Sequence, residues 1–265
     1  MSDTPPEPVP SATILLLREA EPAMEVFMVQ RHHQIDFATG ALVFPGGKAD
    51  PADASKELRD HCDGAGDLDD VELSIRACGI RETFEEAGVL LARDEGESEL
   101  VGGDRLSKLE TGWRNALHSG DRTLLEFVRE ENLRLACDEL VHFAHWITPV
   151  FMPKRFDTHF YLAKAPADQL ALHDGHESVD SVWTTVDGAV DAEAKGERTI
   201  IFPTLVNLKK LGRCTKVADA MTAARAKPIV TVLPTVRKND AGVPMLTLPA
   251  EADYDIVEAP LDALR

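Results

Sequence analysis

Apolar residues near the N-terminus come in short runs that are typical of extended strands. The segments "SATILLLR" (11–18) and "MEVFMVQR" (24–31) are rich in apolar and β-branched residues and are separated by the turn-prone "EAEPA". They predict a β-hairpin or two neighbouring strands, and "ALVFPGG" (41–47) predicts a third strand that ends in a glycine turn. Residues 1–10 contain four prolines and little that could be buried, which predicts a disordered tail.

A helical pattern follows a long polar segment. Residues 48–70 carry many charges and show no apolar periodicity, so we expect an exposed surface loop there. Asp69 and Glu72 then have the spacing of a capping box at the start of a helix, and Gly88 stands where a left-handed residue would end it. One apolar stripe lies between these ends and consists of Leu73, Ala77, Ile80, Phe84 and Ala87.

The second half of the chain changes between helical and extended patterns. Residues 93–141 show helical periodicity and predict two or three helices, after which "HWITPVF", "THFYLAKA" and "SVDSVWTTV" predict strands. We also expect a helix that begins near Pro203, and a terminal hairpin between "KPIVTVLP" and "VPMLTLP" with its turn at "RKNDAG". The predicted organisation is a tail at 1–10, one domain at 11–225 with insertions at about 48–70 and 93–141, and a C-terminal β-hairpin extension of the same domain at 226–265.

Composition narrows the classes of partner and compartment. The 265 residues are 44% hydrophobic, enough for a sizeable core, while a net charge of −18 argues against nucleic acid and anionic membranes as partners. The four cysteines are far apart and form no C-x-x-C pair, which argues against a zinc site or a disulfide framework. Apolar runs are too short to span a bilayer, and "MSDTPPEPVP" lacks the features of a signal peptide, so we predict a cytoplasmic protein.

Three glutamates are crowded into "IRETFEEAGVLL" (80–91). On a helix, Glu82, Glu85 and Glu86 share the face opposite the apolar stripe, where like charges at these spacings repel one another. A divalent cation such as Mg²⁺ or Mn²⁺ removes this repulsion and can activate water. Solvated surface charge is the alternative for such a cluster. The neighbouring Arg81, placed to orient a glutamate, and the glycine turn upstream favour the metal site.

These residues resemble the helical half of the Nudix hydrolase signature, R-E-hydrophobic-x-E-E-x-G-hydrophobic. Residues 81–89, "RETFEEAGV", fit every slot except that Thr83 is only half hydrophobic. The upstream half departs from the family pattern, because Asp67 and Leu73 stand where a glycine and a glutamate are expected. The spacing from the "GG" at 46–47 indicates a loop inserted inside the motif. Glu72 and Glu57 are candidates for the missing glutamate, unless nothing replaces it.

An interrupted motif of this kind is similar to the CoA diphosphatases related to mammalian peroxisomal Nudix motif 19. The likeness extends to "QRHHQIDFATGALVFPGG" and "HWITPVFMPKRFDTHFYLA" and, more loosely, to "GERTIIFPTLVNL". It implies an α/β fold, the Nudix α/β/α sandwich with a mixed sheet, carrying a loop insertion inside the motif and a helical insertion after it. It also implies hydrolysis of a diphosphate bond, which for CoA gives adenosine 3′,5′-diphosphate and 4′-phosphopantetheine.

The resemblance and the charge pattern together suggest roles for individual residues. By resemblance Glu82, held by Arg81, is the first candidate for general base, and the metal ligands are Glu82, Glu85 and Glu86, with the Gly47 carbonyl. An anionic substrate in so acidic a chain needs local cations, for which the candidates are Arg31, Lys154 and Arg155, with Phe156 beside them. An ordinary basic loop is the alternative for the pair at 154–155.

Several alternatives stay open at this point. ADP-ribose, NADH or another nucleoside diphosphate derivative competes with CoA as the substrate. A non-catalytic Nudix-like nucleotide sensor is the rival from another class, although a sensor has no need of metal carboxylates. His142 and His145 alternate with Phe143 and Trp146, which favours a packing or hydrogen-bonding role over a metal site. The oligomeric state is not specified, and a homodimer is possible.

Overall fold

The computed structural model describes residues 5–31, 40–169, 171–174 and 178–261. Its centre is an eight-stranded sheet with the order β10-β2-β1-β9-β8-β11, in which β3 pairs with β2 and β4 pairs with β1. The strands are β1 (Val9–Arg18), β2 (Glu25–Arg31), β3 (Leu42–Val43), β4 (Gly46–Lys48), β8 (Val141–Ile147), β9 (Phe156–Lys164), β10 (Ser178–Thr185) and β11 (Thr231–Val232). The sheet is mixed, because the β1–β9 and β8–β11 pairs are parallel and the other pairs are antiparallel.

Strand β1 lies inside this sheet, which explains its continuous apolar run. Ile14 and Leu16 pack into the core on one face, whereas Leu15 and Leu17 pack into the core on the other. A strand buried on both faces has no reason to alternate with polar residues. The predicted N-terminal hairpin is confirmed, since β1 and β2 pair antiparallel.

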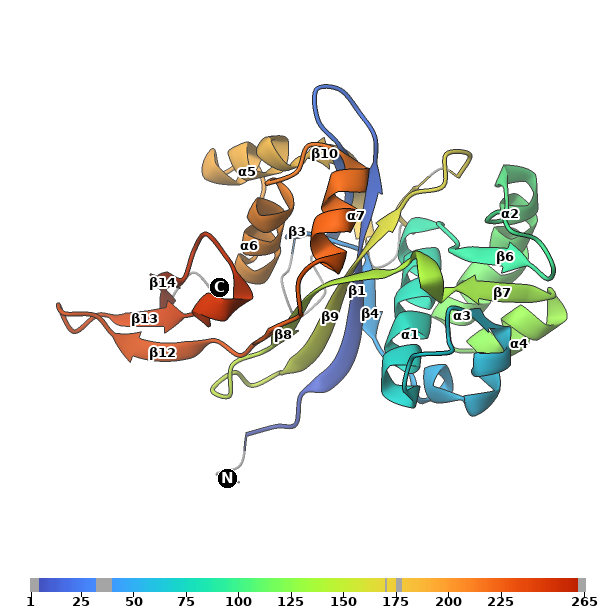
Figure 1. Ribbon diagram of the computed structural model, residues 1–265, viewed down its shortest axis with the longest axis horizontal. Coiled ribbons are helices and arrows are strands. Elements are labelled where there is room, and N and C mark those ends of the chain that lie inside the picture. The colour runs from blue at the N-terminus through green and yellow to red at the C-terminus, as the bar shows by residue number, and fades with distance from the viewer. Residues whose placement is uncertain (1–4, 32–39, 170, 175–177, 262–265) are drawn as a thin grey trace.

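Helices cover both faces of the sheet, as Figure 1 shows. They are α1 (Asp70–Ala87), α2 (Gly103–Leu109), α3 (Asn115–His118), α4 (Leu124–Glu130), α5 (Val186–Ala194), α6 (Phe202–Leu211) and α7 (Val217–Arg225). Helices α1 to α4 contribute to the core on one face, and α5 to α7 contribute to the core on the other. Within the described part of the chain, no helix is long and apolar enough to cross a membrane.

Helix α1 begins and ends where the sequence predicts, although only the Asp69 half of the predicted capping box forms. The Asp69 side chain accepts hydrogen bonds from two backbone N–H groups of the first turn, including that of Glu72. Gly88 ends the helix in the left-handed region, with φ of 68°. Midway along it, Gly79 allows the helix to approach the sheet, since a Cβ there would lie 2.9 Å from the Ile14 side chain.

The segment 48–70 is exposed over much of its length, as expected, but it is not an irregular loop. It forms two 3₁₀ helices, η1 (Pro51–Ala54) and η2 (Lys56–His61), and a short strand, β5 (Cys62–Asp63). Leu58 is fully buried and Asp53 is 2% exposed. Short 3₁₀ turns bury single residues and leave no long apolar period, so a search for α or β periodicity misses such packing.

The insertion at 93–141 contains the predicted helices and also strands that the prediction missed. Strands β6 (Ala92–Asp94) and β7 (Leu133–Ala136) form a small sheet with β5, a π-helical turn η3 (Glu110–Arg114) joins α2 to α3, and a 3₁₀ turn η4 (Cys137–Glu139) precedes β8. The helical pattern therefore ends earlier than expected. Phe127 of α4 stacks on Phe84 of α1, with ring centroids 5.4 Å apart, so the insertion shares the core of α1.

At the C-terminus the predicted hairpin forms, but one strand later than expected. Strand β12 (Thr235–Lys238) pairs with β13 (Pro244–Thr247) across the predicted turn, followed by the 3₁₀ turn η5 (Ala250–Ala252) and by β14 (Glu258–Pro260). The earlier run "KPIVTVLP" instead supplies β11 of the main sheet. Figure 1 shows the β12–β13–β14 sheet extending away from the helices. The predicted tail is shorter than expected, because β1 begins at Val9, and residues 1–4 lie outside the described residues.

Candidate active site

The second half of α1 lies against the glycine turn at β4. The Glu86 carboxylate accepts a hydrogen bond from the Gly46 N–H, with 2.8 Å between Oε2 and N. Glu82 lies so close to the next glycine that a Cβ on Gly47 would be 2.4 Å from Glu82 Oε2. A side chain at position 47 would therefore displace this carboxylate. The glycine turn at 46–47 and the motif that begins at Arg81, 34 positions after Gly47, meet here.

Arg81 connects the carboxylates of this region. Its Nη1 donates to Glu82 Oε1 at 2.8 Å and to Glu85 Oε1 at 3.1 Å. On its other side, Nε and Nη2 donate to the two carboxylate oxygens of Asp53 in η1, and Nη2 also donates to the Lys48 carbonyl at 3.0 Å. The Arg81 guanidinium thus links two glutamates of α1 to Asp53 of the inserted segment.

The glutamates lie opposite the apolar stripe of α1, a face that helical periodicity alone would assign to solvent. In the structure this face is covered. Glu85 and Glu86 are each 5% exposed, and the Glu82 side chain is 13% exposed. The face opposite the apolar stripe is covered by β4, by η1 and by Arg114 of η3, whose Nε donates to the Glu85 carbonyl at 2.8 Å. The alternative of a solvated acidic surface is therefore excluded.

Burial makes this cluster electrostatically costly. Burial, assisted by the charge of Glu85, raises the pKa of Glu82 to about 7 although Arg81 acts in the opposite direction. A carboxyl group with a pKa near neutrality can both accept and release a proton under physiological conditions. The region thus holds more negative charge than Arg81 alone neutralises.

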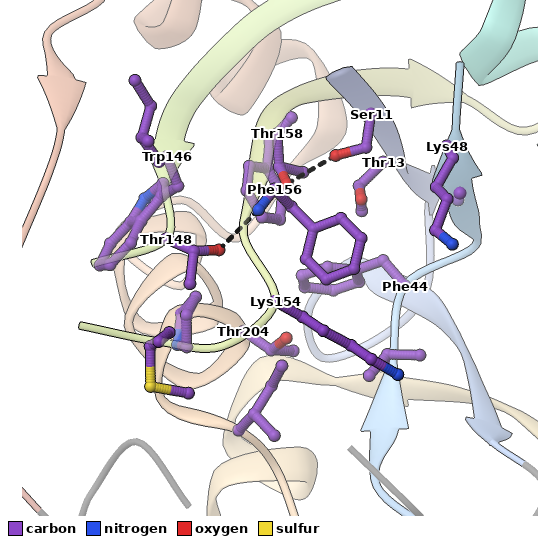
Figure 2. A pocket seen from close by; sticks show the side chains of 18 of the residues that line it. Ser11, Thr13, Phe44, Lys48, Trp146, Thr148, Lys154, Phe156, Thr158 and Thr204 are labelled. Atoms are coloured by element: carbon purple, nitrogen blue, oxygen red, sulfur yellow. Dashed lines mark hydrogen bonds between the residues drawn. The ribbon is translucent and has the colours of Figure 1, made fainter. Parts of the chain in front are cut away.

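A cavity of about 400 Å³ begins at the same glycine turn. Figure 2 shows its lining, which combines aromatic side chains with two lysines. The lining includes Gly46, Gly47, Lys48, Arg31, Phe44, Trp146, Met152, Lys154, Phe156 and Thr204. Phe156, Thr158 and Phe160 of β9 face the cavity, which places it on the face of the sheet opposite α1. The glycines therefore stand between the glutamates and the cavity.

Comparison with known proteins decides the family. The NUDT19 Nudix domain matches residues 60–211, more than half of the chain. The chain belongs to the NUDT19 Nudix family of hydrolases. The match begins inside the segment that interrupts the signature and includes α1, so the interruption is compatible with membership.

Two curated proteins resemble this Nudix chain at modest sequence identity. It is 26% identical over 229 residues to "Acyl-coenzyme A diphosphatase NUDT19" of Xenopus laevis, covering 71% of this chain and 59% of that protein. It is also 26% identical over 224 residues to "Putative nudix hydrolase 7" of Caenorhabditis elegans, covering 78% of this chain and 64% of that protein. The matched region thus spans less than two thirds of the length of these relatives.

A solved structure confirms the predicted Nudix fold. The crystal structure of a NUDIX hydrolase from Alicyclobacillus acidocaldarius superposes with a TM-score of 0.67 and 28% identity, covering 83% of this chain and 97% of that one. The α/β sandwich with a mixed sheet is therefore the architecture of the family and of this Nudix chain.

The structure brings together most of the residues proposed from the sequence, but not all. Gly47, Arg31, Lys154 and Phe156 line the cavity, and Glu82 contacts Gly47 from the other side. Arg155 is not among the described lining residues. Its Nε donates to the Thr148 carbonyl at 3.0 Å and its Nη1 to the Pro6 carbonyl at 2.8 Å, so it holds neighbouring backbone segments together.

Asp53 is the site residue that sequence reasoning missed. Its carboxylate pairs with Arg81 on the side away from Glu82, whereas Glu57 pairs with Arg129 on the surface. Glu72 lies nine residues before Arg81 in α1, a separation of roughly 13 Å along the axis. The available signal was "DPADA", an Asp-Pro start with a second Asp three residues later, typical of a capped turn.

The donor set at α1 fits a hard divalent cation, which Nudix hydrolases generally need. Buried carboxylates beside a glycine turn are oxygen ligands of the kind that Mg²⁺ and Mn²⁺ prefer. Among the described residues, however, the glutamates do not form a group whose three ligand atoms all lie within 4.8 Å of one another. Arg81 Nη1 contacts both Glu82 and Glu85, so this guanidinium already offsets part of the charge that a bound cation would neutralise.

Proposed function

We propose that the chain is a metal-dependent hydrolase that cleaves the diphosphate bond of CoA or acyl-CoA. The observation that carries the proposal is the glycine turn with buried glutamates on one side and a mixed cationic and aromatic cavity on the other. The relative in Xenopus laevis is named an acyl-coenzyme A diphosphatase, which supports the choice of CoA. Because the match spans 59% of that protein, its activity is an inference for this chain.

The chain's own residues would divide the chemistry between them. Glu82 accepts a proton from the attacking water, a role supported by its position against the glycine turn. Arg81, held by Asp53, keeps the Glu82 carboxylate in place. Mg²⁺ or Mn²⁺ bound by Glu82, Glu85 and Glu86, with the Gly47 carbonyl, would lower the pKa of water and neutralise charge on the diphosphate.

The reaction consumes one water molecule and breaks one P–O bond. The water oxygen attacks one phosphorus of the diphosphate, its proton passes to Glu82, and the bridging oxygen leaves with the other phosphate. The products are adenosine 3′,5′-diphosphate and 4′-phosphopantetheine, or its acyl derivative.

The cavity supports an amphiphilic substrate. Phe44, Trp146 and Met152 offer apolar surface for a pantetheine or acyl chain. Lys154 and Lys48 are cations at its wall, as Figure 2 shows, and Arg31 adds a third. We propose Lys154 as the contact for the 3′-phosphate, because Lys154 is among the described lining residues of the cavity and Arg155 is not.

The test is a panel of CoA, an acyl-CoA, dephospho-CoA, ADP-ribose and NADH, incubated with Mg²⁺ or Mn²⁺ and analysed by mass. Cleavage of CoA to the two named products supports the proposal, and its loss on chelation supports the metal requirement. Preferential cleavage of ADP-ribose or NADH would overturn the CoA assignment. Tight binding of one of these nucleotides without cleavage would favour the sensor alternative.

The cytoplasmic location and a homodimer stay predictions.

A further inference from the structure

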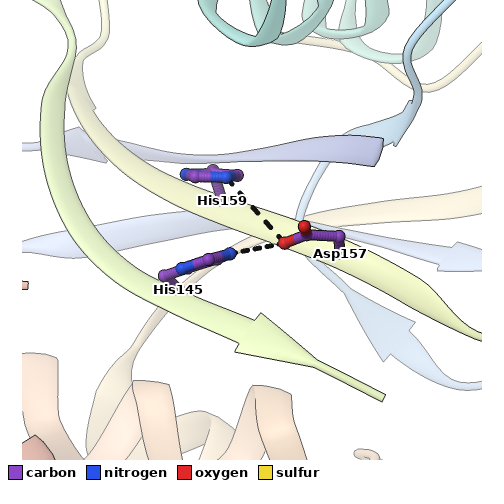
Figure 3. A group of neighbouring side chains, drawn as sticks. All are labelled: His145, Asp157 and His159. Carbon is purple, nitrogen blue, oxygen red and sulfur yellow. Dashed lines mark hydrogen bonds and ion pairs between the residues drawn. The ribbon is translucent and has the colours of Figure 1, made fainter. Parts of the chain in front are cut away.

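A second group of side chains of the kind that bind metals lies on strands β8 and β9 and includes none of the glutamates. It consists of His145, Asp157 and His159, whose ligand atoms all lie within 4.8 Å of one another. Figure 3 shows both imidazoles directed at the same carboxylate oxygen. His145 Nε2 hydrogen-bonds to Asp157 Oδ1, and His159 Nε2 lies 3.9 Å from that oxygen.

The strand register creates this group. His145 and His159 are paired across the antiparallel strands, and Asp157 lies two residues before His159 on the same face of β9. The two rings stack with centroids 4.0 Å apart and an angle of 20° between their planes. Three donors thus converge from two adjacent, hydrogen-bonded strands, which is a more rigid support than a loop.

The remaining ring nitrogens are engaged in a way that suits metal ligands. His145 Nδ1 lies 2.8 Å from Thr231 Oγ1, and His159 Nδ1 lies 3.2 Å from His142 Nε2. Histidines that bind metals commonly hydrogen-bond through their second nitrogen, which fixes the ring orientation. Both Nε2 atoms are left facing Asp157.

All three residues are partly exposed, so an ion can reach the group from solvent.

We propose that His145, Asp157 and His159 form a binding site for one divalent transition-metal ion of the Zn²⁺ type. Two imidazoles and one carboxylate are ligands that Zn²⁺ accepts, whereas Mg²⁺ prefers oxygen donors alone. Zn²⁺ is usually four-coordinate, so three protein ligands leave one position for water or an external ligand. The side chains point to the opposite face from Phe156, Thr158 and Phe160, which line the cavity. The site is therefore distinct from the cavity.

The test is calorimetric titration of Zn²⁺ into the full chain, first freed of metal by chelation and then saturated with Mg²⁺ to occupy the glutamates. We expect one Zn²⁺ per chain, a visible absorption band when Co²⁺ is used as the probe, and a rise in Tm with Zn²⁺. His159→Ala and His145→Ala should each weaken Zn²⁺ binding at least tenfold and abolish the Co²⁺ band. His173→Ala removes a histidine outside the group and should bind Zn²⁺ like the wild type.

The same experiment distinguishes a folding defect of a variant from Zn²⁺ binding at the glutamates. The Tm of each metal-free variant reports its folding, and Asp157→Asn provides a third variant in which a carboxylate is replaced by a side chain of the same shape. Zn²⁺ binding that survives in both histidine variants would overturn the proposal. Zn²⁺ binding that is lost in Glu86→Gln but kept in His159→Ala would also overturn it, because the ion would then occupy the glutamates. Neither outcome depends on which substrate the enzyme cleaves.

Discussion

The glutamates of α1 and the histidine group of β8–β9 gather ligand atoms in two different ways. Glu82, Glu85 and Glu86 come from two turns of one helix, so their spacing in the sequence reveals them. His145 is 12 residues before Asp157 on a different strand, and only the register of the two strands brings them together. A site within one helix can be read from a short motif, whereas a site across strands depends on tertiary pairing.

The two regions also differ in how their charge is compensated. Arg81 lies among the glutamates and contacts two of them, yet the Glu82 pKa is still raised. The histidine group contains its own carboxylate and has hydrogen-bond partners on both outer nitrogens. Burial thus still disfavours the charged form of Glu82, whereas the ring nitrogens of His145 and His159 all lie near polar partners. Different variants should accordingly affect one region and spare the other.

The largest expected effect is the loss of the fold when the inserted segment is removed. Deleting residues 49–63 takes away buried Leu58 and the Asp53 partner of Arg81, which leaves a cavity and an unpaired buried cation. We expect little soluble protein and no cooperative unfolding transition by circular dichroism. The control shortens the exposed turn at 239–242, which should fold normally. A folded 49–63 deletion would show that α1 and β4 hold the glutamates without this segment.

The next largest effect should be the loss of catalytic rate in Glu82→Gln. The amide nearly keeps the shape but cannot take a proton, so we expect kcat to fall by about 10² or more. The comparison variant is His159→Ala, which should keep the Mg²⁺-dependent rate because the described hydrogen bonds and ion pairs of His159 are with His142 and Asp157 and not with Arg81 or the glutamates. A near wild-type rate for Glu82→Gln would move the general base elsewhere. Equal losses in both variants would mean that the two regions are not independent.

The same substitution should change stability in a pH-dependent way in metal-free protein. The folded-state pKa of Glu82 is raised from 4.5 to about 7, so its contribution is fully present below pH 4.5 and is lost as the pH rises through 7. Glu82→Gln should therefore gain stability relative to the wild type between pH 5 and pH 8, by at most roughly 3 kcal/mol. Urea unfolding at both pH values measures this gain, and saturating Mg²⁺ should reduce it. A constant difference would show that the carboxyl group does not titrate there.

Helix α1 could be predicted well from the sequence because its determinants are local. The Asp69 cap, the apolar stripe and Gly88 all act within one or two turns, and each predicted role is found in α1. The N-terminal strands were equally readable, since β1 and β2 are adjacent in the chain and pair with one another. These parts required no knowledge of distant contacts.

What could not be predicted depends on contacts between distant segments. The burial of the glutamates could not be predicted because η1, β4 and η3 cover a face that helical periodicity alone assigns to solvent. Asp53 was missed because its partner, Arg81, is 28 positions away. Lys154 and Arg155 were proposed together as cations for the substrate, but adjacent residues of a loop can point in different directions, and of the two only Lys154 is among the described lining residues of the cavity. Variants of Asp53 and Lys154 therefore test what the structure adds.

Asp53→Asn should weaken catalysis through Arg81, without contact to the reacting atoms. Removing the charge loosens the guanidinium that holds Glu82, and such supporting partners typically contribute about 10- to 100-fold. We expect this loss in kcat rather than in KM, with partial recovery in Asp53→Glu. The control, Asp50→Asn, changes the cap of the same 3₁₀ helix and should keep the rate. A lower Tm with unchanged kcat would make Asp53 a structural residue only.

The smallest effect should separate the two basic residues at 154–155. Lys154 lines the cavity, so Lys154→Gln should raise KM about tenfold for CoA, in keeping with the loss of a charge-assisted hydrogen bond. Dephospho-CoA lacks the 3′-phosphate, so its KM should change little. Arg155→Gln is the matched control: its side chain donates to backbone carbonyls, so any loss should be the same for both substrates and should accompany a lower Tm. A selective effect of Arg155→Gln on CoA would restore the prediction made from the sequence. Equal effects of Lys154→Gln on both substrates would leave Lys48 and Arg31 as the remaining cations of the cavity for that phosphate among the described residues.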